Sequence, residues 1–470
     1  MSSIVAANVP SPAEGVAVES STAGLKLEYE TPRPPERSLR ALVVRGSVWT
    51  LLGDVASRGI RLLSNVVLTR LLAPEVFGLM NVVNVVRQGL ETFSDVGIGP
   101  SIVHNKRGEE PEFLNTAWTI QVVRGFLLCL ASCVLAWPLV WVYQEPQLLW
   151  LLPATGLLAL ASGFASTSIA TLNRRLALGK RTILEQSSYL FSVFVMIAWA
   201  WVSPTVWALV GGGIAGACFR TVLSHYLMAE RRVRFQWDPA AASQLFRFGR
   251  WVFISTMLGF LAARGDRFVV AKMLPDMAAF GRYSIALVLA TLVPDLLQHI
   301  GQGVLFPAYA RLAKVEGSSL LDGVRRSRLA MMALGLPATW CFVLFGQYLV
   351  RFLYDARYED ASWMLRVLSV GGIASTITVG MVPVLMATGD VFRHTVVVAG
   401  RLTCLLAGMA VGAHYWGTFG LVAGVAAADF LNYPLVVWAV RRHGVWSPLT
   451  DLAALMVSAA ALGLGFWFIP

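Results

Sequence analysis

Long apolar stretches alternate with short polar segments along most of this 470-residue chain. A helix needs about 20 mostly apolar residues to cross a hydrocarbon core of about 30 Å. The pattern predicts about thirteen such helices, with twelve to fourteen as the range, at residues 43–68, 77–101, 117–142, 148–170, 183–203, 205–228, 249–273, 279–309, 328–352, 361–387, 394–414, 417–440 and 448–469. The predicted fold class is therefore an all-α polytopic integral membrane protein, whose first span is the least hydrophobic.

The composition excludes a soluble, disordered or fibrous protein. Hydrophobic residues make up 56% of the chain and charged residues 14%, with a mean hydropathy of +0.64. A soluble domain carries about 25% charged residues. The net charge of +11 lies mostly in short segments between the apolar stretches, where it orients a membrane protein, so nucleic acid is not an expected partner.

The distribution of basic residues predicts the orientation. With the N-terminal tail placed inside and the sides alternating, the inside segments hold 24 Lys and Arg and the outside segments hold 5. Cytoplasmic loops carry the excess of basic residues. We therefore expect a cytoplasmic N-terminus and a periplasmic C-terminus.

Three short matches suggest an internal repeat. Their pairs are Gly46–Ser47–Val48–Trp49 with Gly249–Arg250–Trp251, Arg58–Gly59–Ile60–Arg61 with Arg264–Gly265–Asp266–Arg267, and Phe77–Gly78 with Phe280–Gly281. They predict a flexible tail at 1–40, a six-helix lobe at 41–228, a linker at 229–248, a second lobe at 249–440 and an additional helix at 441–470. Six helices per half imply a parallel pseudo-twofold around a central cavity, which is typical of transporters.

The ionisable residues inside the predicted spans point to an anionic ligand. The nine arginines there are Arg58, Arg61, Arg87, Arg124, Arg220, Arg264, Arg267, Arg366 and Arg401, and the acids are Asp54, Glu91, Asp95, Asp266, Asp295 and Asp429. An arginine at the centre of a membrane helix costs roughly 2.5–3.5 kcal/mol. Most of these side chains must therefore reach the interface, pair with acids or face a wet cavity, and the surplus of guanidinium groups favours phosphate.

Two arginine pairs are candidates to bind a pyrophosphate. Arg58 and Arg61, like Arg264 and Arg267, are three residues apart and share a helix face. The alternative is that these side chains pair with Asp54 and Asp266 and only hold the helices together.

Polar stripes on the second and eighth predicted helices could line the same cavity. One consists of Asn81, Asn84, Gln88, Glu91 and Asp95, beside Arg87, and the other of Thr291, Asp295, Gln298, His299 and Gln302. These side chains could bind sugar hydroxyls or couple transport to an ion, with hydrogen bonding between helices as the alternative. Pro294 should kink its helix, and His299 could sense protons.

The sequence lacks the motifs of several kinds of catalytic chemistry. The chain has no complete phosphate-binding loop of the Walker type, no HExxH and no GxSxG. The five cysteines have no metal-ligand spacing. We therefore expect no ATP hydrolysis, disulfide, metal or cofactor, and transport that runs downhill or on an unidentified Na⁺ or H⁺ gradient. The GxxxG spacings at Gly212–Gly216, Gly408–Gly412 and Gly420–Gly424 predict close helix packing.

The order of several short segments resembles one transporter family. The segments are Arg70–Leu71–Leu72–Ala73–Pro74–Glu75–Val76–Phe77–Gly78, Phe93–Ser94–Asp95–Val96–Gly97–Ile98–Gly99, Asn115–Thr116–Ala117–Trp118, Leu172–Asn173–Arg174–Arg175, Trp207–Ala208–Leu209–Val210, Phe248–Gly249, Asp266–Arg267, Gly281–Arg282–Tyr283 and Val304–Leu305–Phe306–Pro307–Ala308–Tyr309–Ala310–Arg311–Leu312. They are similar to segments of the oligosaccharide flippases and polysaccharide exporters of the multidrug/oligosaccharidyl-lipid/polysaccharide superfamily, especially its colanic-acid-exporter-like branch.

The resemblance implies two six-helix lobes, alternating access and an undecaprenyl-diphosphate-linked oligosaccharide as cargo for exopolysaccharide or O-antigen synthesis. By location it assigns the diphosphate to Arg58, Arg61, Arg87, Arg264 and Arg267. It also implies the bacterial inner membrane, membrane lipid and a polysaccharide polymerase or export complex as partners, and a monomer. An odd thirteenth helix departs from the even counts common in this superfamily.

Two other functions remain open at this point. A cation-coupled multidrug exporter of the same superfamily would need a negative cavity, which the arginines oppose. A membrane glycosyltransferase or polymerase would need catalytic acids and usually a long outward loop, whereas the longest predicted outside loop has only about 12 residues.

Overall fold

All regular secondary structure in the described residues is helical. The computed structural model describes Gly53 and residues 57–95, 97–105, 107–174, 178–226, 234–313 and 319–468. After a first helix at 57–71, the helices are α2 (Pro74–Phe93), α3 (Ile98–His104), α4 (Pro111–Tyr143), α5 (Leu148–Gly163), α6 (Ser168–Arg174), α7 (Leu178–Val202), α8 (Val206–Tyr226), α9 (Pro239–Met273), α10 (Met277–Ala290), α11 (Leu292–Ile300), the π-helix η1 (Gly301–Leu305), α12 (Phe306–Leu312), α13 (Ser319–Leu353), the 3₁₀ helix η2 (Ala356–Tyr358), α14 (Ala361–Thr378), α15 (Val382–Ala387), α16 (Val391–Arg441) and α17 (Pro448–Phe468).

Many of these helices are long and apolar enough to cross a membrane. Seven pass this test within the described residues, and eight pass if α10 and α11–α12 form one bent span. Helix α16 contains a break, because Trp416 and Gly417 have non-helical backbone angles. This break lies between the two spans that were predicted at 394–414 and 417–440. The protein is therefore a multi-pass membrane protein, while the number thirteen stays a prediction.

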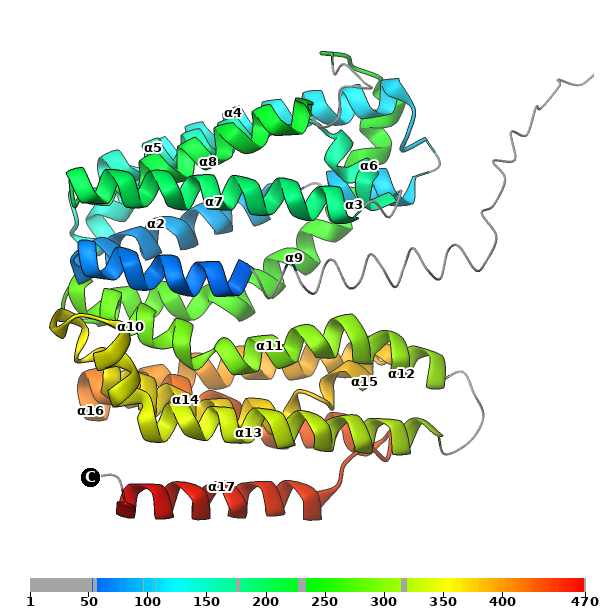
Figure 1. Ribbon diagram of the computed structural model, residues 1–470. Helices are drawn as coiled ribbons and strands as arrows, with labels where there is room; N and C mark the ends of the chain where they lie inside the picture. Colours follow the sequence, from blue (N-terminus) through cyan, green and yellow to red (C-terminus); the bar gives the residue numbers. More distant parts are fainter. Residues whose placement is uncertain are drawn as a thin grey trace, which may run out of the picture. The chain divides into compact units, whose positions relative to one another are not determined.

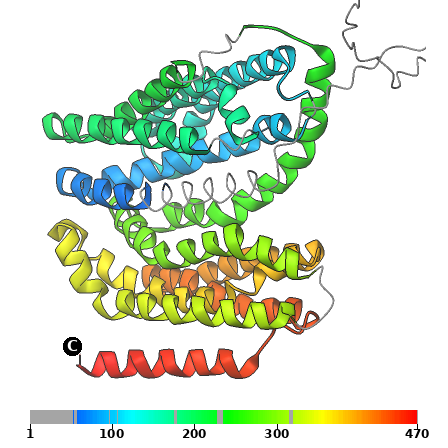
Figure 2. The same cartoon turned by 45° about the vertical axis from the view of Figure 1, so that its right-hand side comes forward.

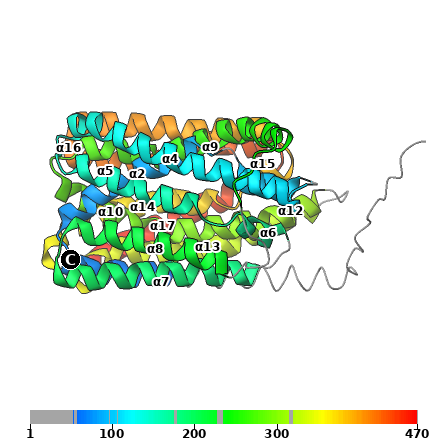
Figure 3. The same cartoon turned by 90° about the horizontal axis from the view of Figure 1, so that it is seen from above.

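The helices run side by side in two groups (Figure 1). The helix at 57–71 and α2–α8 form what we call the N-terminal lobe, and α10–α17 form the C-terminal lobe (Figure 2). Helix α9 joins them. Seen from above, the long helices lie nearly parallel (Figure 3). We name the two ends of the bundle after residues there: the Pro74 end, where α2 and α10 begin, and the Pro239 end, where α9 begins.

The lobes meet closely where α2 crosses α10. A Cβ on Gly78 would lie 2.0 Å from the Met277 carbonyl oxygen, and one on Gly281 would lie 1.9 Å from the Pro74 carbonyl oxygen. Two glycines are therefore required for the backbones to approach this closely. One turn further on, Asn81 donates a hydrogen bond to Ser284 Oγ.

These contacts are symmetric under an offset of 203 residues: Gly78 meets Met277 as Gly281 meets Pro74, and Asn81 bonds to Ser284, its own equivalent. Pro74 and Met277 differ by 203 residues, as do Gly78 and Gly281, and so do Asn81 and Ser284. The Phe77–Gly78 and Phe280–Gly281 match has the same offset. The pseudo-twofold relation of whole lobes itself stays a prediction.

Breaks divide four of the predicted spans within the described residues, of which the one expected at 361–387 is divided into α14 and α15. Helix α10 and the α11–α12 segment meet at an angle of 42°, just before Pro294, which confirms the predicted kink. The span expected at 77–101 ends as α2 at Phe93, and α3 begins after Gly97, whose φ is 62°. The span expected at 148–170 is divided into α5 and α6.

Close packing at the glycine motifs is confirmed. A Cβ on Gly412 would lie 2.0 Å from the Gly420 carbonyl oxygen, and one on Gly408 would lie 2.8 Å from that of Gly424. A Cβ on Gly216 of α8 would lie 2.6 Å from the Cβ of Ser192 of α7.

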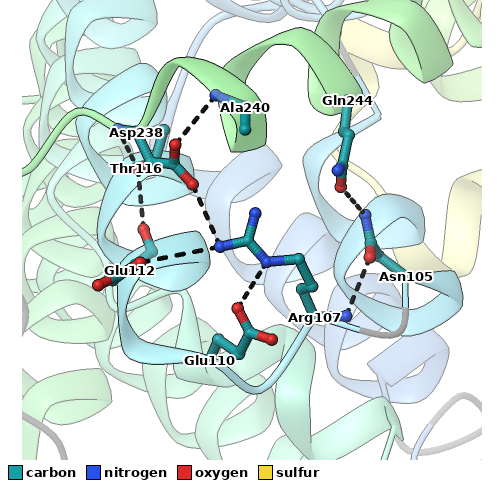
Figure 4. Close-up of polar contacts among 8 residues, drawn as sticks. All are labelled: Asn105, Arg107, Glu110, Glu112, Thr116, Asp238, Ala240 and Gln244. Carbon is teal, nitrogen blue, oxygen red and sulfur yellow. Dashed lines mark hydrogen bonds and ion pairs between the residues drawn. The ribbon is translucent and has the colours of Figure 1, made fainter. Parts of the chain in front are cut away.

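The start of α9 is held against the α3–α4 turn by the polar contacts in Figure 4. Arg107 donates from Nε to Glu110 at 2.6 Å and from Nη2 to Asp238 at 3.2 Å. Asp238 caps α9 by accepting from the Ala240 amide at 3.0 Å. Asn105 donates to Gln244 at 2.8 Å. Residues 239–245 are therefore a helical segment that packs on the N-terminal lobe, in a region that was expected to be a linker at 229–248.

A buried ion pair anchors α17. Arg328 of α13 and Asp451 of α17 bond to each other at 3% and 2% exposure, respectively. Tyr433 donates to the second oxygen of Asp451 at 2.6 Å. Removing one partner of such a pair would leave a buried charge, which is strongly destabilising. This contact fixes the Pro239 end of the additional helix against the C-terminal lobe.

Some expectations lie outside the described residues. They are the tail at 1–40, the beginning of the first span, the segment Gly46–Ser47–Val48–Trp49 and Asp54. All five cysteines are free. The described residues contain no group of three or more His, Cys, Asp or Glu that could hold a metal.

The α2–α10 crossing predicts a sharp effect of one methyl group. Gly281→Ala places a Cβ against the Pro74 carbonyl, so the helices must separate, and we expect a loss of about 1–3 kcal/mol in the free energy of unfolding. The thermal unfolding midpoint of the purified protein measures this. Gly463→Ala, whose Cβ would meet nothing within 4 Å, is the control. Equal midpoints for both variants would show that the crossing tolerates a side chain.

The α9 cap predicts an acid-dependent contribution to stability. The amide of Ala240 and the guanidinium of Arg107 hold the pKa of Asp238 below its ordinary value, and the hydrogen bond to Glu110 raises the pKa of Arg107. The stabilisation from Asp238 is thus present above the unfolded pKa of about 3.9 and is lost as pH falls through the folded pKa.

Asp238→Asn keeps an oxygen that can cap the helix but removes the titration. Unfolding curves from neutral to acidic pH should therefore show a shallower acid loss for Asp238→Asn than for the wild type. Identical pH profiles would mean that the pair does not contribute.

Candidate functional site

Charged side chains gather where α9 meets α10 and α16. Asp266 on α9 is 8% exposed and lies among the charges of Arg264, Arg267 and Arg401. Tyr283 of α10 is fully buried and lies close to Asp266 and Arg267. The helix positions follow from the sequence, because Arg264 and Arg267 are one turn apart.

The polar groups of this cluster are incompletely paired. Asp266 Oδ1, Arg267 Nε and the Tyr283 hydroxyl are buried and have no hydrogen-bond partner among the described residues. Arg264 and Arg267 make no ion pair there. Buried polar groups are nearly always hydrogen-bonded, so these three atoms keep hydrogen-bonding capacity that a bound group could use.

One arginine of the cluster is already neutralised. Arg401 Nε donates to Asp429 at 2.6 Å, both on α16. The prediction counted both residues, but their pairing depends on the break in α16, which folds the two halves of this helix against each other.

Arg58 reaches across to the other lobe. Its Nη2 lies 2.9 Å from His299 Nδ1 and 3.2 Å from Nε2. His299 Nδ1 also lies 2.7 Å from the Asp295 carbonyl oxygen. Because a guanidinium only donates, Arg58 donates to whichever ring nitrogen carries no proton, and with an Nδ1 proton directed at the Asp295 carbonyl that nitrogen is Nε2.

The remaining predicted site residues near Arg58 and the α9 cluster differ in their exposure and contacts. Arg61 lies over Tyr189 of α7, with Cζ 5.4 Å from the ring centroid. Asp295 and Gln298 of α11 are exposed, and the charge of Asp295 acts on Arg267 and Arg401. Asn84 is half-buried on α2.

Three predicted residues lie elsewhere. Arg87, Glu91 and Asp95 line a cavity of about 530 Å³ within the N-terminal lobe. Arg87 donates to Glu91 at 2.6 Å. Asp95 follows α2 in the turn, where it accepts from the Gly97 amide at 2.9 Å. The stripe expected along one continuous helix is thus divided by the end of α2.

The arginines therefore separate by their pairing. Arg58, Arg61, Arg264 and Arg267 have no carboxylate within ion-pair distance among the described residues, whereas Arg87 and Arg401 do. Arg58 lies instead against the ring of His299, and Arg61 lies over the ring of Tyr189. We call these four the unpaired arginines. They keep donors that an oxyanion can occupy.

Some polar groups of the two regions could not be recognised from the sequence. Tyr283 was only part of a matching segment, and nothing in the spacing of residues showed that its hydroxyl is buried beside Asp266. Arg124 donates to Ser94 at 2.8 Å beside the N-terminal cavity. Arg220 also lines that cavity. Both arginines were counted within the predicted spans, but the sequence did not assign them to a site.

Solved structures show which fold this is. The lipid II flippase MurJ in an inward closed conformation matches with a TM-score of 0.65 and 12% identity, covering 90% of this chain and 92% of that one. An inward-facing MATE-family multidrug resistance transporter of the MOP superfamily matches with a TM-score of 0.60 and 13% identity, covering 85% and 94%. The predicted all-α membrane transporter fold is confirmed.

Relatives with curated names agree with this fold. The lipopolysaccharide biosynthesis protein WzxC of Escherichia coli (strain K12) is 23% identical over 444 residues, covering 91% of this chain and 89% of that protein. The succinoglycan biosynthesis transport protein ExoT of Rhizobium meliloti (strain 1021) is 23% identical over 291 residues, covering 62% and 57%.

The match to a family model is longer than the stretch that the short segments suggested. The model described as "Polysaccharide biosynthesis protein" matches residues 67–363, which is more than half of the chain and includes α9, α10 and α11. The fold, the named relatives and this match agree, and the protein belongs to this family of polysaccharide biosynthesis proteins.

Proposed function

We propose that this protein is a flippase that moves a lipid-linked oligosaccharide from the cytoplasmic to the outer leaflet by alternating access, for exopolysaccharide or O-antigen synthesis. The observation that carries the proposal is the set of four unpaired arginines on the helix at 57–71 and on α9. Their guanidinium groups would bind the diphosphate, and the polyprenyl chain would stay in the lipid between the helix at 57–71 and the α10–α12 segment.

The charge of the site argues against export of cationic drugs. Arg58, Arg264 and Arg267 would repel a cation, and the carboxylate of Asp429 is already taken by Arg401. A diphosphate gains two parallel hydrogen bonds from each guanidinium that it meets. The fold shared with a multidrug transporter does not decide the cargo, because function depends on the site.

The proposal includes a location and partners. We infer a bacterial inner membrane, a cytoplasmic N-terminus and a periplasmic C-terminus, because basic residues concentrate in the segments of the Pro239 end. The Pro239 end would then face the cytoplasm. A polymerase or export complex would receive the cargo, and the protein would act as a monomer.

We further propose that a proton drives the cycle through His299. The imidazole accepts from Arg58 only while it is neutral. Arg58 is the charge that faces it from the helix at 57–71, and Asp295 lies one turn away on α11. A diphosphate that draws Arg58 away would leave His299 free to take up a proton, which couples cargo binding to protonation.

The unpaired arginines predict graded loss of export. A charge-assisted hydrogen bond contributes about 1.5–3 kcal/mol, so Arg264→Ala or Arg267→Ala should weaken cargo binding roughly ten- to hundredfold. Polysaccharide export in cells that lack their own copy of the gene measures this. The same series includes Arg58→Ala and Arg61→Ala.

Arg351→Ala is the matched control, because Arg351 forms an exposed ion pair with Glu359 of the kind that contributes little. Membrane insertion of every variant is checked by its amount in the membrane fraction. Wild-type export by all four arginine variants would contradict the proposed diphosphate site.

The coupling proposal makes a separate prediction. His299→Gln keeps a side-chain acceptor for Arg58 at every pH but cannot be protonated. In proteoliposomes with an imposed pH gradient, we expect flipping by the wild type to respond to the gradient and flipping by His299→Gln not to respond. An equal response by both proteins would exclude His299 as the coupling group and leave the diphosphate site untouched.

A further inference from the structure

The cavity inside the N-terminal lobe is separate from the proposed diphosphate site. It measures about 530 Å³, and all its lining residues come from α2 to α8 and the turns between them. No residue of α9 to α17 lines it. Its charged residues lie toward the Pro239 end, near the end of α2 and the beginning of α7.

Four arginines and three acids line this cavity. Arg87 pairs with Glu91 at 2.6 Å, Arg181 pairs with Glu185 at 2.8 Å, and Arg124 lies 3.9 Å from Asp95. This accounts for every acid in the lining.

Arg220 of α8 is the cation left over. Its half-buried side chain makes no ion pair or hydrogen bond within the described residues. In addition, Arg87 Nε is buried without a partner. An arginine held within a membrane protein without a counter-charge is costly, and one oxyanion in the cavity would remove this cost.

The other residues that line the cavity indicate which further chemical groups the anion has. The carboxylates of Glu91, Asp95 and Glu185 can only accept hydrogen bonds, and their arginine partners leave some of their lone pairs free. Ser166 adds a hydroxyl group, and Thr167, whose hydroxyl donates to the Leu114 carbonyl, adds an acceptor oxygen. Such a lining suits the hydroxyl groups of a polyol. The volume lies in the range of sites for small ligands, about 300–1,000 Å³.

We propose that this cavity binds a small hydroxylated monoanion, with its acidic group on Arg220 and its hydroxyls on the carboxylates. Two sources share this chemistry: an acidic sugar residue of a glycan and the phosphoglycerol headgroup of a membrane lipid. The proposal goes beyond the flippase function and uses none of the unpaired arginines.

The test measures binding to the purified protein in detergent. The probes are glucuronate and glycerophosphoglycerol, a phosphodiester with one negative charge, each compared with its neutral counterpart, glucose and glycerol, at constant ionic strength. We expect both acids to bind and both neutral compounds to bind about tenfold more weakly or not at all, because the charge-assisted bond to Arg220 is lost.

Variants locate the site. Arg220→Gln should weaken binding of both acids about tenfold, whereas Arg351→Gln, a surface control, and Arg264→Gln, in the proposed diphosphate site, should bind like the wild type. Arg220→Lys keeps the charge but loses the planar fork, so it should also bind more weakly, and it carries the test if the glutamine variant does not fold.

Binding of neither acid to the wild type would overturn the proposal. It would also be overturned if binding survives both Arg220 variants or is lost in Arg264→Gln. Loss of binding in Arg264→Gln would not contradict the diphosphate site. Wild-type export by the unpaired-arginine variants would contradict the diphosphate site but not this cavity, so the two proposals are tested separately.

Lipid nanodiscs distinguish the two sources. If phosphatidylglycerol in phosphatidylcholine nanodiscs abolishes glucuronate binding, then the lipid headgroup is the occupant. If glucuronate binds equally well with and without phosphatidylglycerol, then the acidic sugar is the occupant. Both results support the site and assign its ligand.

Discussion

The cost of an unneutralised guanidinium group inside a membrane is the constraint on which this molecule depends. Each buried arginine must find a carboxylate, an acceptor on a neighbouring helix or a ligand. Arg401 and Arg328 find carboxylates, Asp429 and Asp451, which join the two halves of α16 and join α13 to α17, respectively. Where no carboxylate is available, a bound anion would offset the cost of the buried charge. Structural and functional arginines therefore differ in their partners rather than in their depth.

The contact between α2 and α10 gives the unpaired arginines their setting. Backbone-to-backbone approach at Gly78 and Gly281 joins the lobes at the Pro74 end. Further toward the other end, Arg58 of the helix at 57–71 and His299 of α11 lie within hydrogen-bond distance across the lobes. The α2–α10 crossing is tightly packed, whereas the Arg58–His299 contact is polar and reversible. This arrangement would let the lobes rock while the crossing stays packed. The 42° bend and the π-helix in the α10–α12 segment lie in the helix that would have to deform.

Much of the fold was predictable because membrane helices have a strong signal. Apolar length alone placed the long helices, since lipid forces every backbone group to be satisfied within its own helix. Pro294 and the glycine pairs predicted a kink and close crossings, which are local consequences of a missing amide or a missing side chain. The breaks after Phe93 and within the span that contains α5 and α6 were missed, because turns inside an apolar stretch barely change its hydropathy.

The sequence by itself determined the class of molecule, the surplus of arginine within the spans and the residues from which a site could be built. Tertiary structure alone decided which of these residues share a site. Arg87, Glu91 and Asp95 face a cavity of the N-terminal lobe, whereas Arg58 points at His299, which is 241 residues away in the chain. The physical reason is that a charge is paired or unpaired according to the helices packed beside it, and helical periodicity specifies a face but not the neighbour that covers it.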